Sequence, residues 1–181
     1  TLNNALSKYV KKVPFQEPPY TTSIDMVNHV KEVTPDSLNY LIKDMFETIT
    51  LYQNRVVETK SKKLDNGKYQ VDIEFKVSKY RNNEKGRIFY GEEERDSITY
   101  QTDDMKKPEY SVFLEDYIDV GIFGEDNDEK EIELYLKKLK ISSIHNKISI
   151  IVDQEPIEVG IDPYNKLIDT NSEDNRMKIE K

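Results

Sequence analysis

The spacing of apolar residues changes once along this chain, near residue 48, and this change constrains the fold more than any other feature. Before it, apolar residues recur every three or four positions, which is typical of one face of a helix. After it, they alternate with polar residues, which is typical of a strand with one buried and one solvated face. The sequence therefore predicts an α+β protein, in which about three helices precede a mainly antiparallel β-sandwich.

Residues 1–46 are expected to form this helical lead-in, or a bridge to another domain. The apolar stripe of residues 2–13 predicts a first helix, which Pro14 ends because proline cannot continue a helix. A second helix should follow a cap at Thr22 or Ser23. Its expected buried residues recur every three positions and are Ile24, Val27 and Val30.

A third helix should be capped by Thr34, with Pro35 in its first turn. Its expected apolar face consists of Leu38, Leu41, Ile42, Met45 and Phe46. Together the apolar stripes are larger than a small sheet needs for its own core. We therefore expect an exposed interface on this segment, around Tyr9, Tyr20 and Tyr40.

Residues 47–159 are expected to form a β-sandwich of about seven strands, similar to immunoglobulin or fibronectin domains. Strict alternation over residues 69–77 marks the clearest strand. Asn66-Gly67 before it is typical of a tight hairpin, because these residues accept positive φ. The other predicted strands are 49–62, 87–90, 97–101, 117–123, 132–136 and 147–152.

The tail, residues 160–181, is expected to pack on the sheet. Within it, residues 163–168 are predicted to form a short helix. Residues 171–175 are loop-like, because Asn, Ser and Asp favour turns, and the end of the tail is expected to be disordered.

Composition excludes several classes of site and partner. The net charge of −8 argues against nucleic acid, whose phosphates require clustered Lys and Arg. The absence of cysteine excludes disulfides, zinc–thiolate sites and thiol nucleophiles. No segment approaches the roughly 18 apolar residues of a membrane span, so this part is expected to be soluble and not to insert into a membrane itself.

The search for catalytic or metal-ligating residues returns none. A zinc peptidase needs two histidines one helical turn apart, whereas His29 and His145 stand alone. Both are interpreted as polar surface residues. Two acidic stretches, 126–129 and 169–173, resemble partial calcium loops, but both lack the glycine and the final glutamate of such loops. No cofactor is therefore predicted for this chain.

Two stretches resemble a known family. The first runs from Phe15-Gln16-Glu17-Pro18-Pro19-Tyr20, through Ser23-Ile24-Asp25 and Thr34-Pro35-Asp36, to Phe46-Glu47-Thr48-Ile49-Thr50-Leu51-Tyr52. The second is Gly160-Ile161-Asp162-Pro163-Tyr164-Asn165-Lys166-Leu167-Ile168-Asp169, followed by Asp174-Asn175. They resemble the C-terminal region of bacterial membrane proteins that join an ABC-transporter-type permease to a gluzincin zinc aminopeptidase of the aminopeptidase-N type.

This resemblance implies that a peptidase domain of the same polypeptide lies N-terminal to Thr1 and is the partner of this region. It also implies zinc in that parent, and a location on the extracytoplasmic face of a bacterial membrane. The family's His-Glu-x-x-His motif matches no position here, so the chain is expected to be non-catalytic.

Two other hypotheses come from different classes. A stand-alone module could bind peptide or carbohydrate in a groove lined by Tyr90, Tyr100 and Tyr117. A small hydrolase could use two converging carboxylates, although no tryptophan is present to form a sugar platform.

Overall fold

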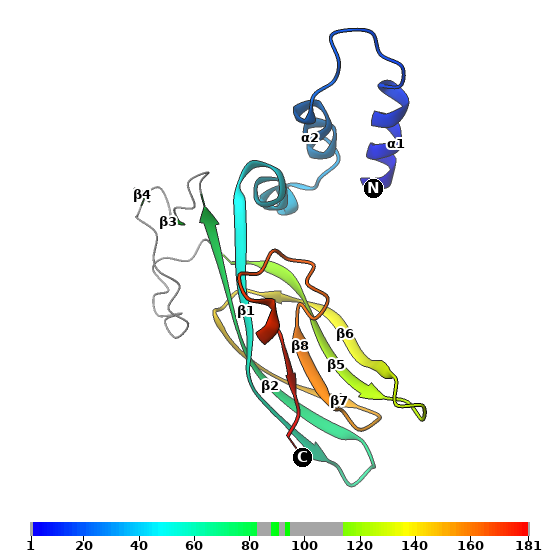
Figure 1. Ribbon diagram of the computed structural model, residues 1–181, viewed down its shortest axis with the longest axis vertical. Helices are drawn as coiled ribbons and strands as arrows, with labels where there is room; N and C mark the ends of the chain where they lie inside the picture. The colour runs from blue at the N-terminus through cyan, green and yellow to red at the C-terminus, as the bar shows by residue number, and fades with distance from the viewer. Residues whose placement is uncertain (1, 83–87, 91–92, 95–113, 181) are drawn as a thin grey trace. The chain divides into compact units, whose positions relative to one another are not determined.

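The computed structural model describes residues 2–82, 88–90, 93–94 and 114–180. The chain divides into two compact units, Thr1–Ile49 and Thr50–Lys181. The first is helical and the second consists of two β-sheets (Figure 1). The α+β fold class, with mostly antiparallel strands, is confirmed.

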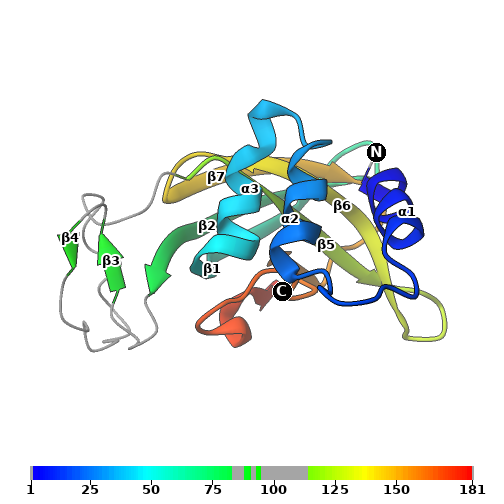
Figure 2. The ribbon, with the colours of Figure 1, turned by 90° about the horizontal axis from the view of Figure 1, so that it is seen from above.

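In the helical unit, α1 (Leu2–Lys12) and α2 (Ser23–Lys31) lie side by side (Figure 1, Figure 2). The expected cap at Thr22 is present. The Asp25 carboxylate accepts hydrogen bonds from the Thr22 backbone N–H, at 2.7 Å, and from the Thr22 hydroxyl, at 2.9 Å. This contact fixes the first turn of α2, where an acidic side chain also stabilises the helix dipole.

The third helical segment is irregular. It begins as a 3₁₀ turn, Asp36–Leu38, continues as α3 (Asn39–Ile42) and ends as a π turn, Lys43–Glu47. Thr34 does not cap it, contrary to the sequence prediction. The Thr34 hydroxyl instead donates to the Val30 carbonyl at 2.8 Å at the end of α2, and Pro35 is the residue that precedes the 3₁₀ turn.

The first sheet has five strands. These are β1 (Ile49–Lys63), β2 (Tyr69–Asn82), β3 (Ile88–Tyr90), β4 (Glu93–Glu94) and β7 (His145–Val152). The path β1-β2-β3-β4 runs across it, and β7 pairs antiparallel with the first half of β2. The β1–β2 connection is the predicted Asn-Gly turn, in which the glycine has a φ of 81°.

The second sheet has the strand order β6-β5-β8-β9 and is antiparallel throughout. Its strands are β5 (Asp116–Glu125), β6 (Glu131–Ile141), β8 (Glu158–Ile161) and β9 (Arg176–Lys178). The predicted strands at 117–123 and 132–136 therefore form the β5–β6 hairpin. The predicted strand at 97–101 lies outside the described residues.

The two sheets share one apolar core. β2 contributes its alternating side chains Val71, Ile73, Phe75 and Val77, and β5 contributes Ile118, Val120 and Ile122. All seven are at most 1% exposed. Burial of these side chains is the main term that holds the sheets together, at roughly 1.5–3 kcal/mol for each large apolar residue.

The tail differs from its predicted form. Residues 163–168 form no helix, and Arg176–Lys178 form the strand β9 at the edge of the second sheet. The segment Asp162–Asn175, here called the C-terminal strap, runs to the free edge of β1. There the Tyr52 backbone N–H donates to the Ile168 carbonyl at 2.8 Å, and the Tyr52 carbonyl accepts from the Thr170 N–H at 2.9 Å.

Side chains of the strap continue this pairing at Asn54, two residues further along the same edge of β1. The Asn54 backbone N–H donates to the Asp169 carboxylate at 2.9 Å. With its amide oriented for hydrogen bonding, Asn175 donates to the Asn54 carbonyl at 2.9 Å. The strap thus satisfies backbone groups that an edge strand would otherwise leave open.

One ion pair is buried between the sheets. The Lys79 ammonium on β2 lies 3.1 and 3.0 Å from the two carboxylate oxygens of Asp116 on β5, and both side chains are almost fully buried. The ammonium also lies 5.8 Å from the centre of the Tyr52 ring, so this pair links three strands.

Replacing one residue of this ion pair should destabilise the fold more than replacing both residues with apolar ones. We expect Lys79→Met or Asp116→Leu alone to lower the free energy of unfolding by about 3–5 kcal/mol, because the remaining buried charge loses this ion pair. The double variant should lose less than either single variant. Urea unfolding at pH 7 measures all three, and a double loss equal to the sum of the single losses would contradict the prediction. Lys140→Met, which removes an exposed ion pair with Glu115, is the control, with a loss below about 1 kcal/mol.

Candidate functional site

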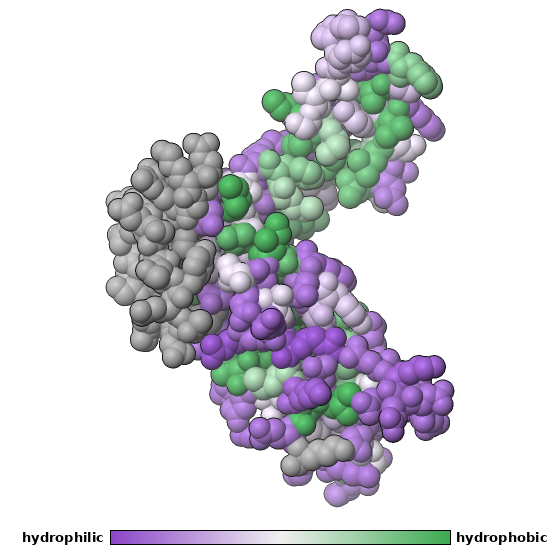
Figure 3. Space-filling model, viewed as in Figure 1, coloured by the Kyte–Doolittle hydropathy of each residue, from purple (hydrophilic) through white to green (hydrophobic). Residues whose placement is uncertain are grey.

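The helical unit exposes a large set of apolar side chains, here called the helical apolar surface. They come from both regular helices, the connectors, the third helical segment and the first residue of β1. The set is Leu2, Leu6, Val10, Phe15, Tyr20, Ile24, Val33, Met45, Phe46 and Ile49. Figure 3 shows hydrophobic residues gathered along the helices of this unit. An apolar surface of this extent on a small unit is typical of a binding surface.

The three tyrosines predicted for this surface differ in exposure. Tyr20 is 68% exposed, whereas Tyr9 and Tyr40 are half-buried. The Tyr9 ring meets the ring of His29 edge to face, with centroids 5.2 Å apart, and so joins α1 to α2. Tyr20 is therefore the one of the three that presents most of its ring, and Tyr9 contributes to packing within the unit.

The sequence prediction for the buried face of α2 was wrong at Ile24, which is 69% exposed. Val30 is buried, but the expected apolar face of the third segment also leaves Met45 and Phe46 exposed. The physical reason is length, because short helices bury only a narrow stripe against one another. The sequence prediction of the interface did not include Phe15, which follows α1 and is fully exposed. Its exposure could have been predicted because it lies in a connector, between Pro14 and the pair Pro18-Pro19.

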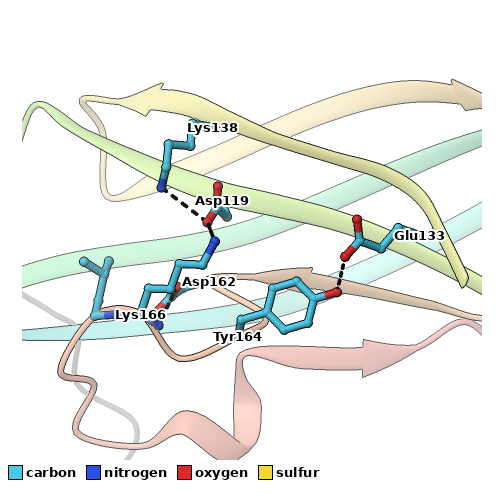
Figure 4. Close-up of polar contacts among 7 residues, drawn as sticks. Asp119, Glu133, Lys138, Asp162, Tyr164 and Lys166 are labelled. Carbon is cyan, nitrogen blue, oxygen red and sulfur yellow. Dashed lines mark hydrogen bonds and ion pairs between the residues drawn. The ribbon is translucent and has the colours of Figure 1, made fainter. Parts of the chain in front are cut away.

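A second candidate lies in the sheet unit, where the strap begins (Figure 4). Asp162 is buried, and its carboxylate accepts backbone N–H groups from Lys166 at 3.0 Å and Leu167 at 2.9 Å. Asp162 and Asn165 both have positive φ, a region that Asp and Asn tolerate better than most residues. Burial raises the pKa of Asp162 although these two hydrogen bonds oppose it.

Asp119 on β5 faces the same turn and is buried. Its carboxylate lies 2.7 Å from the Lys166 ammonium of the strap and 3.3 Å from the Lys138 ammonium of β6 (Figure 4). Burial alone would raise the pKa of Asp119. The hydrogen bonds and positive charges of the two lysines outweigh it, and the pKa is lowered.

Two paired glycines make room for this turn. Gly121 on β5 lies directly opposite Gly160 on β8. A Cβ atom at Gly121 would lie 2.7 Å from the Phe123 ring and 3.2 Å from Cγ of Pro163, and one at Gly160 would lie 2.9 Å from Cβ of Pro163. The strap therefore packs on the outer face of the second sheet because both strands lack a side chain at that point.

Aromatic and charged side chains complete this cover. The ring of Tyr164 meets the Phe123 ring edge to face at 6.1 Å, and its hydroxyl donates to Glu133, which raises the pKa of Tyr164. The Arg176 guanidinium lies 4.2 Å from the centre of the Phe123 ring and donates to Glu131 and Glu158. Phe123 is fully buried as a result.

Asp119 and Asp162 are converging carboxylates with opposite pKa shifts, a pattern also found in acid–base pairs. Their geometry supports a structural role instead. Both oxygens of Asp162 accept backbone N–H groups, Asp119 is held by two lysines, and both carboxylates are buried. A substrate atom could reach neither carboxylate without displacing the strap.

The acidic stretches that resemble calcium loops are hydrogen-bonded turns. Asp126 accepts the backbone N–H groups of Asp128 and Lys130, both at 2.9 Å. Asp169 accepts the N–H of Asn171 at 3.0 Å. Within the part of the chain that the structure describes, no group of three or more His, Cys, Asp or Glu side chains is placed to hold a metal ion.

Two of the three tyrosines of the predicted groove have side chains outside the described residues. Tyr100 and the side chain of Tyr90 lie outside the described residues, and Tyr117 is exposed on β5. A depression of about 280 Å³ crosses β2 and β7, and it is lined by Asp72, Ile73, Glu74, Lys147, Ile148 and Ser149. Its lining contains no aromatic side chain to stack on a ligand.

None of the described helices combines the length and apolar character needed to cross a membrane. Comparison with protein-family models, with curated proteins and with solved structures found no match to this chain.

Removing the Asp119 charge tests its role in holding the strap. We expect Asp119→Asn to lower the free energy of unfolding by about 1–2 kcal/mol at pH 7, because two lysines lose the negative charge that they share. The pKa of Asp119 lies below its ordinary value of 3.8, so its contribution is present above that value and is lost as the pH falls through the lowered pKa. Urea unfolding of both proteins between pH 7 and pH 2 should show the difference disappearing at the acid end. Asp153→Asn, at a largely exposed carboxylate, should change stability at pH 7 by less than about 0.5 kcal/mol.

Filling the glycine pair should dislodge the strap. Gly160→Val places methyl groups against Pro163 and Arg176, and we expect a loss of about 1–3 kcal/mol. Hydrogen exchange should rise across residues 162–170. Gly67→Ala is the matched control. It strains a turn with positive φ, but the Cβ atom that it adds has no other atom within 4 Å. Unchanged exchange in the strap of Gly160→Val would show that the glycines are not needed for its packing.

Proposed function

We propose that this chain is a non-catalytic accessory domain of a larger, membrane-anchored zinc aminopeptidase-like protein. Its helical apolar surface packs on the peptidase domain of the same polypeptide, on the extracytoplasmic face of a bacterial membrane. The observation that carries the proposal is the set of ten exposed large apolar side chains in residues 2–49.

The chemistry of the helical unit supports this role. Among its described residues, the buried apolar side chains are Ala5, Val30 and Ile42, against ten large apolar side chains that are exposed. Covering that area with a partner would release water from it, at about 25 cal/mol for each Å² buried. Phe15 and Tyr20 are aromatic anchors of the kind that concentrate binding energy at interfaces.

The buried carboxylates of the sheet unit also support a non-catalytic role. Its buried carboxylates Asp116, Asp119 and Asp162 each hold a lysine or a backbone N–H group of the chain itself. Groups used in this way stabilise a rigid module. Such a module would shape access to a neighbouring active-site cleft, and the zinc and its water would belong to the peptidase domain.

The test uses the two domains as separate proteins. The reading frame upstream of Thr1 is expected to encode a His-Glu-x-x-His motif, and the domain carrying it should bind the 181-residue chain in calorimetric titration. Phe15→Ser and Ile24→Ser should each weaken binding at least about tenfold, because each removes an apolar anchor.

Ile168→Ser is the matched control, since Ile168 is equally exposed but belongs to the sheet unit. It should leave the affinity unchanged. A reading frame without the motif, or binding that none of the helical substitutions weakens, would refute the proposal.

A further inference from the structure

The strand β7 forms an open edge of the first sheet. It pairs with β2 along eight residues, from Tyr69↔Val152 to Lys76↔His145. Among the described residues, no strand pairs with its other edge. The opposite edge of this sheet, at β1, is occupied by the strap. In the part of the chain that the structure describes, one edge of this sheet is covered, and the other offers backbone N–H and C=O groups that can pair with another chain.

The side chains of β7 alternate as a half-buried strand requires. Ile148, Ile150 and Val152 face the core. Lys147 on the outward face has 75% of its side chain exposed, and Ile151 is 58% exposed. An exposed isoleucine on an open edge strand with high β-propensity is typical of a pairing site.

We propose that β7 pairs antiparallel with β7 of a second copy of this chain, around a twofold axis at Ile150. The strand is complementary to itself in that register. Lys147 of each copy lies opposite Asp153 of the other, and Ile148 lies opposite Val152. Cross-strand pairs of opposite charge and of β-branched residues both stabilise antiparallel pairing.

This register also keeps both cores intact. Opposed residues in an antiparallel pair share one face, as Ile148 and Val152 do on β7, and Asp153 directly follows the strand at a position that matches Lys147 in the alternation. A shift by one residue would turn the apolar face of one copy to solvent. Two neighbouring registers also match the faces. One, centred on Ser149, would place Lys147 opposite Ile151 and lose the charge pairing, and the other, centred on Ile151, would oppose only residues 150–152 of β7.

The occupant is a second copy because one short segment supplies both charges of the pair. Both groups are available at the surface, although each also has a partner within its own chain. Lys147 pairs with Glu74, and the Asp153 carboxylate lies 2.7 Å from the Lys68 ammonium. A single strand pair buries less than about 1,000 Å², so the dimer is weak and depends on concentration.

Sedimentation analysis of the 181-residue chain over a range of concentrations measures this dimer. Lys147→Glu and Asp153→Lys should each raise the dissociation constant at least about tenfold, since each places two like-charge pairs across the axis. The double variant Lys147→Glu with Asp153→Lys restores both pairs in reversed polarity. Its dissociation constant should return to within about threefold of the original.

The double variant distinguishes charge pairing between two copies from the loss of ion pairs within one chain. It loses both intrachain ion pairs, with Glu74 and with Lys68, and still should dimerise. Lys140→Glu on β6 changes the net charge by the same amount as Lys147→Glu and should have no effect. In the dimer, amide exchange at residues 147–153 should slow as concentration rises. A chain that stays monomeric up to about 1 mM, or a dimer that both single variants leave unchanged, would overturn the proposal.

Discussion

The sheet unit depends on one constraint, which is that the backbone groups at the edge of β1 must find partners. The C-terminal strap supplies them with the backbone of residues 168–170 and with the side chains of Asp169 and Asn175. Its own starting turn is held by Asp162, which accepts two backbone N–H groups. Burial raises the pKa of Asp162 and of Asp169, so the strap carries an electrostatic cost that its hydrogen bonds and packing offset.

The two units present different chemistry. In the sheet unit the conspicuous polar groups hold the chain together, as with Lys79 and Asp116 between the sheets. In the helical unit, the conspicuous feature is apolar area that faces outward, including Phe15 and Ile24. The proposed accessory role rests on this outward-facing apolar area of the helical unit, and not on the buried charges of the sheet unit.

Much of the architecture could be predicted because strand periodicity is a local property. The alternation over residues 69–77 predicted β2, and Asn66-Gly67 predicted its hairpin. Predictions failed where a hydrogen bond from or to one side chain decided the local structure. Residues 163–168 resemble a short helix, but Asp162 captures the N–H groups of Lys166 and Leu167 and holds a turn on the second sheet. Thr34 likewise bonds backward to Val30 instead of capping forward.

The sequence by itself determined the order of helix and sheet, the strand faces and the absence of thiol chemistry, because these follow from residue type and spacing. Only the tertiary structure decided which polar residues are buried together. Lys79 and Asp116 are 37 positions apart, and Asn54 and Asp169 are 115 apart. Pairing across such separations depends on how the sheets stack and where the strap returns, and no local pattern encodes it.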